Sequence, residues 1–177
     1  PDDMALRQKL DGVDNREKFR IRYYDNDPDF IRLEKKIKVN GLCGKQSVIL
    51  TREQCECIAR GDIRWMREAG EPLLLELYSK MHYQMLRPRT VVDYEREAFV
   101  YRPGHVRVTM DHHIQTGLAS RDLFNLRLPT IGVCPQGTAI LEVKYDEFLP
   151  DFLADLLQIS NRQSSPFSKY AAARIFG

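Results

Sequence analysis

The stretch Lys18–Tyr24, KFRIRYY, sets the pattern for the rest of the chain. Side chains of an extended strand alternate between two faces, so Phe19, Ile21 and Tyr23 share one face. The other face carries Lys18, Arg20 and Arg22. Taken alone, such a charged face is typical of a sheet surface in contact with water. Whether it instead holds an anion depends on the other strands.

Length and composition limit the class of protein. The 177 residues suit one domain with a sizeable core, and 43% hydrophobic residues are incompatible with a disordered chain. A net charge of +2 argues against nucleic-acid binding through bulk charge. The four cysteines form no C-x-x-C pair, there is no signal peptide, and no apolar run approaches the roughly 18 residues of a membrane span. We therefore expect a cytoplasmic, single domain over residues 1–177.

Strands and helices are predicted from periodicity and from turn residues. Thr51 and Gln54 have the spacing of a capping box at a helix start, and Gly61 marks its end. Other helices are predicted from Pro72 to the break at Pro88, after Pro150 and after Pro166. Strands are predicted at residues 18–24, 30–38, 45–50, 90–101, 105–115 and 138–145. Meandering strands with helices outside the sheet indicate the α+β class.

The division into an apolar and a cationic face recurs on most of the predicted strands. On the second strand Arg32, Glu34 and Lys36 share a face, and on a later strand Arg107 and Asp111 do. Two architectures fit: a sandwich with wet charged faces, or a barrel whose charged faces line a lumen and whose apolar faces helices cover. We expect few acidic partners on these faces, so that the cations repel one another and favour a bound anion.

Six short motifs occur in a specific order: FRIRYY, IRLEKKIK followed by GKQSV, YEREAFV, VRVTMD, LEVKY and FSKY. In this order they resemble the vacuolar transporter chaperone (VTC) domain, the polyphosphate polymerase of the triphosphate tunnel metalloenzyme (CYTH-like) superfamily. The resemblance extends from Met4 to Tyr170. It implies an antiparallel β-barrel tunnel wrapped by helices, in which ATP, a polyphosphate chain or triphosphate, and a divalent metal (Mn²⁺ or Mg²⁺) bind.

The resemblance also implies roles for particular residues. Glu142 of LEVK matches the metal ligand. Arg7, Lys45 and Lys144 are the further substrate-binding candidates. The catalytic phosphate contacts that it implies are Arg20, Arg22, Lys36, Arg96, Arg107 and Lys169. Two family strands, with patterns like ELKY and YFDT, are not found, so we expect a tunnel incomplete at its N-terminal end. A family lysine is also replaced by Pro166.

Each key residue has an alternative interpretation. Glu142 could simply pair with a neighbouring lysine, and Lys169 could be an exposed helix lysine. Glu34 is interpreted as a partner of Lys36 rather than as a metal ligand. The sequence DHH, Asp111 to His113, is not interpreted as a metal site, because adjacent histidines on a regular strand point to opposite faces.

The resemblance favours transfer of the γ-phosphoryl group of ATP to a polyphosphate chain. Such chemistry needs positioning and charge neutralisation, which suits a chain with no recognisable nucleophile–histidine pair. Two alternatives stay open: a tunnel triphosphatase, and a non-catalytic module that binds polyphosphate or an inositol polyphosphate. Nucleic acid is disfavoured as a partner because the charged faces lack a run of aromatics for base stacking. Membrane-associated partner proteins remain open.

Overall fold

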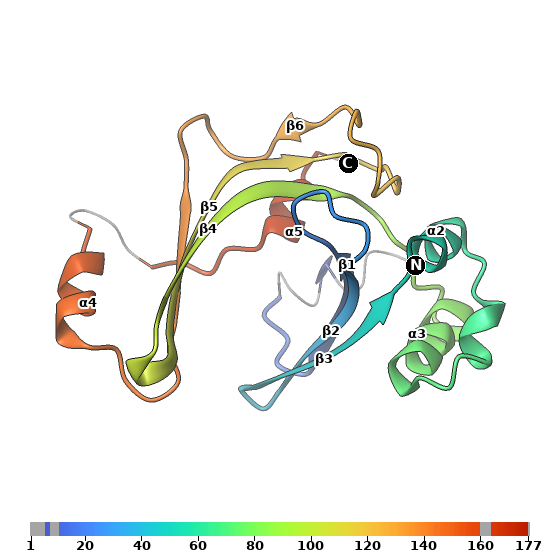
Figure 1. The fold of residues 1–177 in the computed structure, drawn as a ribbon, viewed down its shortest axis with the longest axis horizontal. Helices are drawn as coiled ribbons and strands as arrows, with labels where there is room; N and C mark the ends of the chain where they lie inside the picture. The colour runs from blue at the N-terminus through green and yellow to red at the C-terminus, as the bar shows by residue number, and fades with distance from the viewer. Residues whose placement is uncertain (1–5, 8–10, 160–163, 177) are drawn as a thin grey trace. The chain divides into compact units, whose positions relative to one another are not determined.

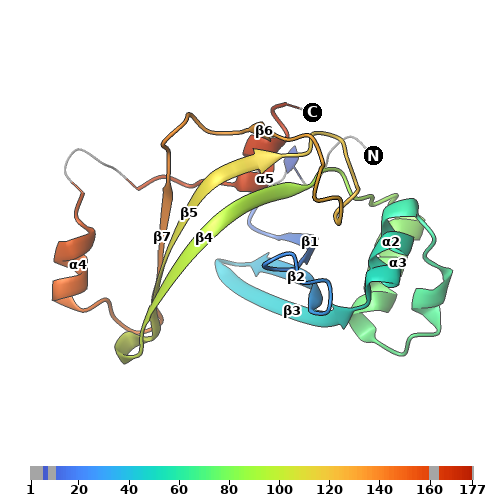
Figure 2. The same ribbon diagram turned by 45° about the horizontal axis from the view of Figure 1, so that its top comes forward.

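The chain folds as two units, each built on its own antiparallel sheet. The computed structural model describes residues 6–7, 11–159 and 164–176. The first unit comprises Pro1–Arg89 and Ala119–Leu128, and the second comprises Thr90–Leu118 and Pro129–Gly177. Figures 1 and 2 label most of their helices and strands.

The sheet of the first unit is a three-stranded meander. Its strands are β1 (Arg16–Arg22), β2 (Ile31–Val39) and β3 (Leu42–Leu50), in the order β1-β2-β3. The turn between β2 and β3 consists of Asn40 and Gly41, whose φ angles are 49° and 80°. Asn-Gly with two positive φ angles is the preferred two-residue hairpin turn, because its twist matches that of the strands. The turn therefore fixes the β2–β3 register.

Helix α2 (Arg52–Arg60) begins and ends where its capping residues predict. The Thr51 hydroxyl accepts a hydrogen bond from the Gln54 amide, and the Gln54 side chain accepts one from the Thr51 amide. Gly61 ends the helix in the left-handed conformation, with φ of 87°. This reciprocal cap satisfies backbone groups that the first turn leaves unpaired.

Helices cover the apolar face of the first sheet, as the sequence pattern predicts. The short 3₁₀ helix η1 (Arg64–Arg67) and α3 (Pro72–Tyr83) complete this layer beside α2 (Figure 1). Sheet and helices share one core, whose buried members are Ile31, Leu33, Leu50, Cys55, Ile58, Ile63, Met66, Leu73, Leu74, Leu77 and Met81. Lys35 lies on this apolar face but pairs there with Glu17 and Glu76. A charge buried among helices is tolerated because it is paired.

The second unit is built on a long antiparallel hairpin. It consists of β4 (Val92–Tyr101) and β5 (Val106–Thr116), joined by η2 (Pro103–His105). Figure 2 shows β7 (Ile140–Lys144) beside β5, with which it pairs. The remaining elements are β6 (Ile131–Gly132), α4 (Asp151–Leu157) and α5 (Lys169–Ala173).

The observed elements confirm the predicted mixture of antiparallel sheets and helices. The predicted barrel tunnel, incomplete at its N-terminal end, is not confirmed: the strands that the structure describes form two open sheets and no closed barrel. Within residues 6–7, 11–159 and 164–176, no helix is both long enough and apolar enough to cross a membrane.

Candidate functional site

One face of the first sheet concentrates positive charge. The register pairs Arg20 with Glu34, and Lys18 with Lys36, so these side chains share a face. Lys45 of β3 is opposite Lys36 and joins them. We call this surface the cationic face. Its eight basic residues are Arg16, Lys18, Arg20, Arg22, Arg32, Lys36, Lys38 and Lys45, and the strands contribute a single carboxylate to it, Glu34.

Glu34 organises the centre of the cationic face. Its carboxylate is 1% exposed and accepts a 2.7 Å hydrogen bond from Arg20 Nε. Lys45 Nζ lies 2.7 Å from its other oxygen, and Arg22 lies 3.7 Å away. Burial alone would raise the pKa of Glu34, but hydrogen bonds from Lys45 and Arg20, together with the arginine charges, lower it to about 2. Glu34 therefore stays ionised and fixes the basic groups around it.

The environment of Glu34 corrects one expectation and confirms another. The basic residues do have an acidic partner, so the expectation of few acidic partners is wrong at this position. Glu34 does contact basic side chains, namely Arg20, Arg22 and Lys45. Its predicted contact with Lys36 stays a prediction. The strands thus contribute eight basic residues and one carboxylate to this face, and Asp14, outside the strands, lies 3.1 Å from Lys38.

The second unit has a face of mixed charge. Register places Arg96 opposite Asp111. It places Thr109 opposite Glu142, and Arg107 opposite Lys144. We call this surface the mixed face. It therefore unites Arg96, Arg107, Lys144 and Glu142, all of which the resemblance singles out, with Asp111 and Thr109.

Asp111 is the anchor of the mixed face. It is fully buried, and both of its oxygens accept hydrogen bonds from Arg96, at 2.6 and 2.7 Å. Lys169 of α5 reaches the same carboxylate, with Nζ 2.5 Å from Oδ2. Burial would raise the pKa of Asp111, but the hydrogen bonds and charges of Arg96 and Lys169 lower it. The alternative of an exposed Lys169 is wrong, because only 20% of its side chain is exposed.

An aromatic ring completes this arrangement. Arg96 lies 5.3 Å from the centre of the Tyr94 ring, and Lys169 lies 5.0 Å from it. Cations placed over an aromatic face are stabilised by its quadrupole. Tyr94, Arg96 and Lys169 are thus held together although they lie far apart in the sequence. The sequence pattern did not assign a role to Asp111; its place on the same face of a two-faced strand as Arg107 was the available signal.

Glu142 lies beside a basic neighbour. Its Oε1 is 3.2 Å from Lys144 Nζ, and 43% of its side chain is exposed. Burial would raise the pKa of Glu142, but the charge and hydrogen bond of Lys144, with the charges of Lys169 and Arg96, lower it. Opposite Glu142, the buried Thr109 hydroxyl has no hydrogen-bond partner among the described residues. The carboxylate is therefore ionised and next to an unsatisfied oxygen.

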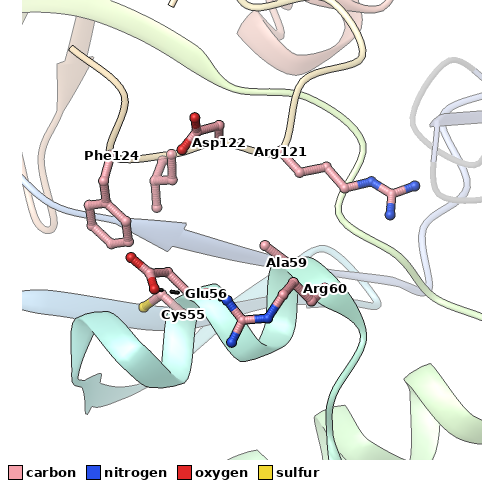
Figure 3. Close-up of a pocket in the computed structure, with 8 residues that line it drawn as sticks. Cys55, Glu56, Ala59, Arg60, Arg121, Asp122 and Phe124 are labelled. Carbon is pink, nitrogen blue, oxygen red and sulfur yellow. Dashed lines mark ion pairs between the residues drawn. The ribbon is translucent and has the colours of Figure 1, made fainter.

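Two of the predicted phosphate contacts are exposed to solvent. Arg107 is exposed on the mixed face, and Arg7 is exposed in the short described segment near the N-terminus. A pocket of about 320 Å³ in the first unit lies between α2 and residues 121–124 (Figure 3). None of the predicted site residues lines it. Phe124 there packs against Tyr23, on the helix-covered side of the sheet, so the pocket is separate from the cationic face.

The histidines of DHH depart from the predicted orientation. A β-bulge interrupts the pairing of β4 and β5, and His113 within it has a φ of 49°. The left-handed residue turns the strand, so the Nδ1 atoms of His112 and His113 approach to 3.3 Å. The expectation that the two rings face opposite ways is therefore wrong.

Comparison with protein-family models decides the family. The model of the VTC domain matches residues 1–175, nearly the whole chain. The chain belongs to the VTC domain family. Membership indicates a function related to polyphosphate, and the family is associated with its enzymatic synthesis. Comparison of this VTC domain with curated proteins and with solved structures gives no match.

Proposed function

We propose that this VTC domain is a metal-dependent polyphosphate polymerase that transfers the γ-phosphoryl group of ATP to a polyphosphate chain. The observation that carries the proposal is the cationic face, with eight basic residues around one buried carboxylate. Polyphosphate is a repeating anion, and a sheet face with regularly spaced cations provides repeated contacts along it.

Arginine and lysine have complementary tasks in such binding. Arg20 and Arg22 offer planar guanidinium groups that can bind phosphate oxygens bidentately, whereas Lys45 acts as a compact charge. Each charged hydrogen bond contributes about 1.5–3 kcal/mol. Because Glu34 already holds these three side chains, little conformational freedom is lost when an anion binds. Phosphoryl transfer depends mainly on such preorganised positioning.

The mixed face offers a hard divalent metal one carboxylate and one neighbouring hydroxyl oxygen. Mg²⁺ and Mn²⁺ prefer oxygen ligands, and Mg²⁺ commonly uses one or two carboxylates together with substrate phosphates. Glu142 would hold the ion, and the unsatisfied Thr109 hydroxyl is the neighbouring oxygen. When bound, the metal supplies neutralisation of phosphate charge. Arg96 and Lys169, fixed by Asp111, supply further positive charge on the same face.

One observation favours binding without catalysis as the second candidate. The contact between Glu142 and Lys144 at 3.2 Å satisfies the carboxylate without a metal. Lys36, Arg107 and Arg7 are further phosphate contacts in the polymerase proposal. A triphosphatase would share the phosphate contacts and differ in its access to water.

The deciding experiment measures the products formed from ATP. The chain is incubated with ATP and Mn²⁺, and long-chain polyphosphate is separated from free phosphate on a gel. We expect chains; free phosphate alone would support the triphosphatase, and no turnover with retained tripolyphosphate binding would support the binding module. Glu142→Gln should abolish metal-dependent turnover and leave anion binding in place. Metal-dependent turnover at the wild-type rate in that variant would exclude Glu142 as the metal ligand.

Arg22 tests the cationic face separately. Arg22→Ala should weaken tripolyphosphate binding about tenfold, measured by calorimetry without metal, because one charged contact is lost. Arg60→Ala is the control, since Arg60 is exposed on α2 and lies outside the cationic face. Equal affinities of the two variants would argue against the cationic face as the binding surface.

A further inference from the structure

The β-bulge of the second unit gathers three side chains capable of binding a metal. In regular pairing each residue of β4 would oppose one residue of β5. Here His113 and Ile114 together oppose the single Tyr94, between the pairs Asp93–Gln115 and Glu95–His112. Histidine tolerates the left-handed conformation better than most residues, and His113 adopts it. The bulge therefore brings two consecutive imidazoles to the carboxylate of Glu95.

The distances among these groups suit one small ion. The two Nδ1 atoms are 3.3 Å apart. Glu95 Oε1 lies 2.9 Å from His113 Nδ1, and Glu95 Oε2 lies 3.5 Å from His112 Nδ1. A tetrahedral Zn²⁺ with bonds of about 2.0–2.1 Å separates its ligand atoms by roughly 3.3 Å. The separation of the two imidazole nitrogens equals this value, and each imidazole has one of the two Glu95 oxygens within 3.5 Å.

Glu97 provides the contact that a metal-bound histidine needs. Its Oε1 lies 3.4 Å from Nε2 of His112, the ring nitrogen that faces away from the other two ligands. In metal sites the second ring nitrogen commonly donates to a carboxylate, which fixes the tautomer and orients the ring. A hydrogen on Nε2 leaves Nδ1 of His112 with its lone pair directed to the ion.

We propose that Glu95, His112 and His113 form a binding site for a borderline divalent transition-metal ion such as Zn²⁺. Imidazole and carboxylate ligands suit Zn²⁺, Cu²⁺ and Ni²⁺ better than they suit Mg²⁺. His113 and Glu95 are 67% and 65% exposed, so the ion is reached directly from solvent and keeps water in its remaining position. Among residues 6–7, 11–159 and 164–176, this is the only group of three or more such side chains.

This site is distinct from the one at Glu142. Glu95 and Glu97 alternate with Arg96 along β4, and Glu142 shares the mixed face with Arg96. The two sites thus lie on opposite faces of one sheet and have different donor atoms. The inference does not depend on the proposed polymerase activity. It has a structural consequence, because an ion there fixes the same bulge that contains Tyr94, the ring beneath Arg96 and Lys169.

The first test measures binding of Zn²⁺ alone to the full chain after treatment with a chelator. We expect one equivalent to bind by calorimetry. His113→Asn and Glu95→Gln should each lose at least about tenfold in affinity, and Glu97→Gln about tenfold through the outer contact. His105→Asn is the matched control, because His105 is an exposed histidine that faces a carboxylate, Asp146, at 3.5 Å but has no third ligand among the described residues. Its affinity should equal that of the wild type.

A second measurement needs no variant and so does not depend on how the variants fold. Ring ¹⁵N chemical shifts of the four histidines are followed during Zn²⁺ addition. We expect Nδ1 of His112 and His113 to shift and both rings to take the Nε2–H tautomer, with His82 and His105 unchanged. Co²⁺ in place of Zn²⁺ should give no thiolate charge-transfer band. Such a band, unshifted His112 and His113, or equal affinity in His113→Asn would overturn the proposal.

Discussion

A single buried carboxylate determines how the cationic face behaves. Glu34 contacts Arg20, Arg22 and Lys45, so it both neutralises and orients them. Asp111 has the same relation to Arg96 and Lys169 in the second unit. Each unit therefore uses one ionised side chain to hold basic groups in place.

Replacing Glu34 by glutamine should destabilise the first unit. The variant keeps the shape of the side chain but leaves the basic neighbours without their counter-charge, and we expect a loss of about 2 kcal/mol in the free energy of unfolding, measured in urea. Glu56→Gln on the exposed surface of α2 is the control, with an expected change under about 0.5 kcal/mol. Tripolyphosphate should restore much of the loss in Glu34→Gln. Equal stability of the two variants would contradict this role.

The same carboxylate predicts how stability depends on pH. The pKa of Glu34 is about 2 in the folded chain, against a usual value of 4.5. Because the folded value is lower, its contribution is complete above pH 4.5 and is lost as the pH falls toward 2. Urea unfolding across this window should show a smaller loss of stability for Glu34→Gln than for the wild type. Parallel curves would show that Glu34 is not responsible.

The charge of Asp111 is expected to hold α5 in place. Asp111→Asn removes the charge that Arg96 and Lys169 share, so α5 should lose its fixed position beside the strands. Hydrogen exchange of the α5 amides should rise in this variant. Asp122→Asn, a change at an exposed residue of the first unit, is the control and should leave the exchange of the α5 amides unchanged. Unchanged exchange in Asp111→Asn as well would mean that apolar packing alone holds α5.

At the scale of elements, alternation along strands predicted which side chains of the sheets share a face. KFRIRYY, IRLEKKIK and VRVTMD divide into the two faces that the register shows, because a period of two survives any regular pairing. The capping residues Thr51, Gln54 and Gly61 likewise predicted the bounds of α2. What alternation could not predict is the β-bulge. It depends on pairing with β4 and on one residue, His113, in the left-handed conformation.

Sequence patterns also could not predict which basic side chains contact the buried carboxylates of Glu34 and Asp111. Parity places Arg20 and Glu34 on one face, but it does not say that they are opposite each other, since register comes from the Asn40–Gly41 turn and from the core. Lys169 reaches Asp111 through a helix 58 positions further along the chain. Contacts between such distant segments come from packing.

The cap of α2 gives a prediction for an element. Thr51→Ala removes the hydroxyl that accepts from Gln54, and the helix should lose about 1 kcal/mol of stability. Because α2 contributes Cys55 and Ile58 to the core, thermal unfolding of the first unit should report this loss. Ser47→Ala, an exposed change in β3, is the control. If Thr51→Ala left thermal unfolding unchanged, core packing alone would set the start of the helix.

At the scale of the whole molecule, charge is unevenly distributed although the net charge is only +2. Basic residues gather on the cationic face, whereas the acidic residues that balance them in the net charge lie mostly elsewhere in the chain. Affinity for tripolyphosphate should therefore fall steeply with added salt, because the Debye length shrinks from about 10 Å at 0.1 M to about 3 Å at 1 M. Calorimetric titrations at several salt concentrations test this, and Arg22→Ala should have a shallower dependence than the Arg60→Ala control. An affinity independent of salt would place the ligand elsewhere.

The order of strands in the first sheet has a consequence for solubility. Among the described strands, β1 and β3 are the outer ones, and each presents backbone groups that a strand of another molecule could pair with. Repulsion between the basic side chains of β1, and at Lys45 of β3, discourages such edge-to-edge aggregation. A long polyanion that neutralises these charges removes the same repulsion. The surface that we propose binds polyphosphate therefore also protects against self-association, and saturating it with a polyanion leaves the sheet edges unprotected.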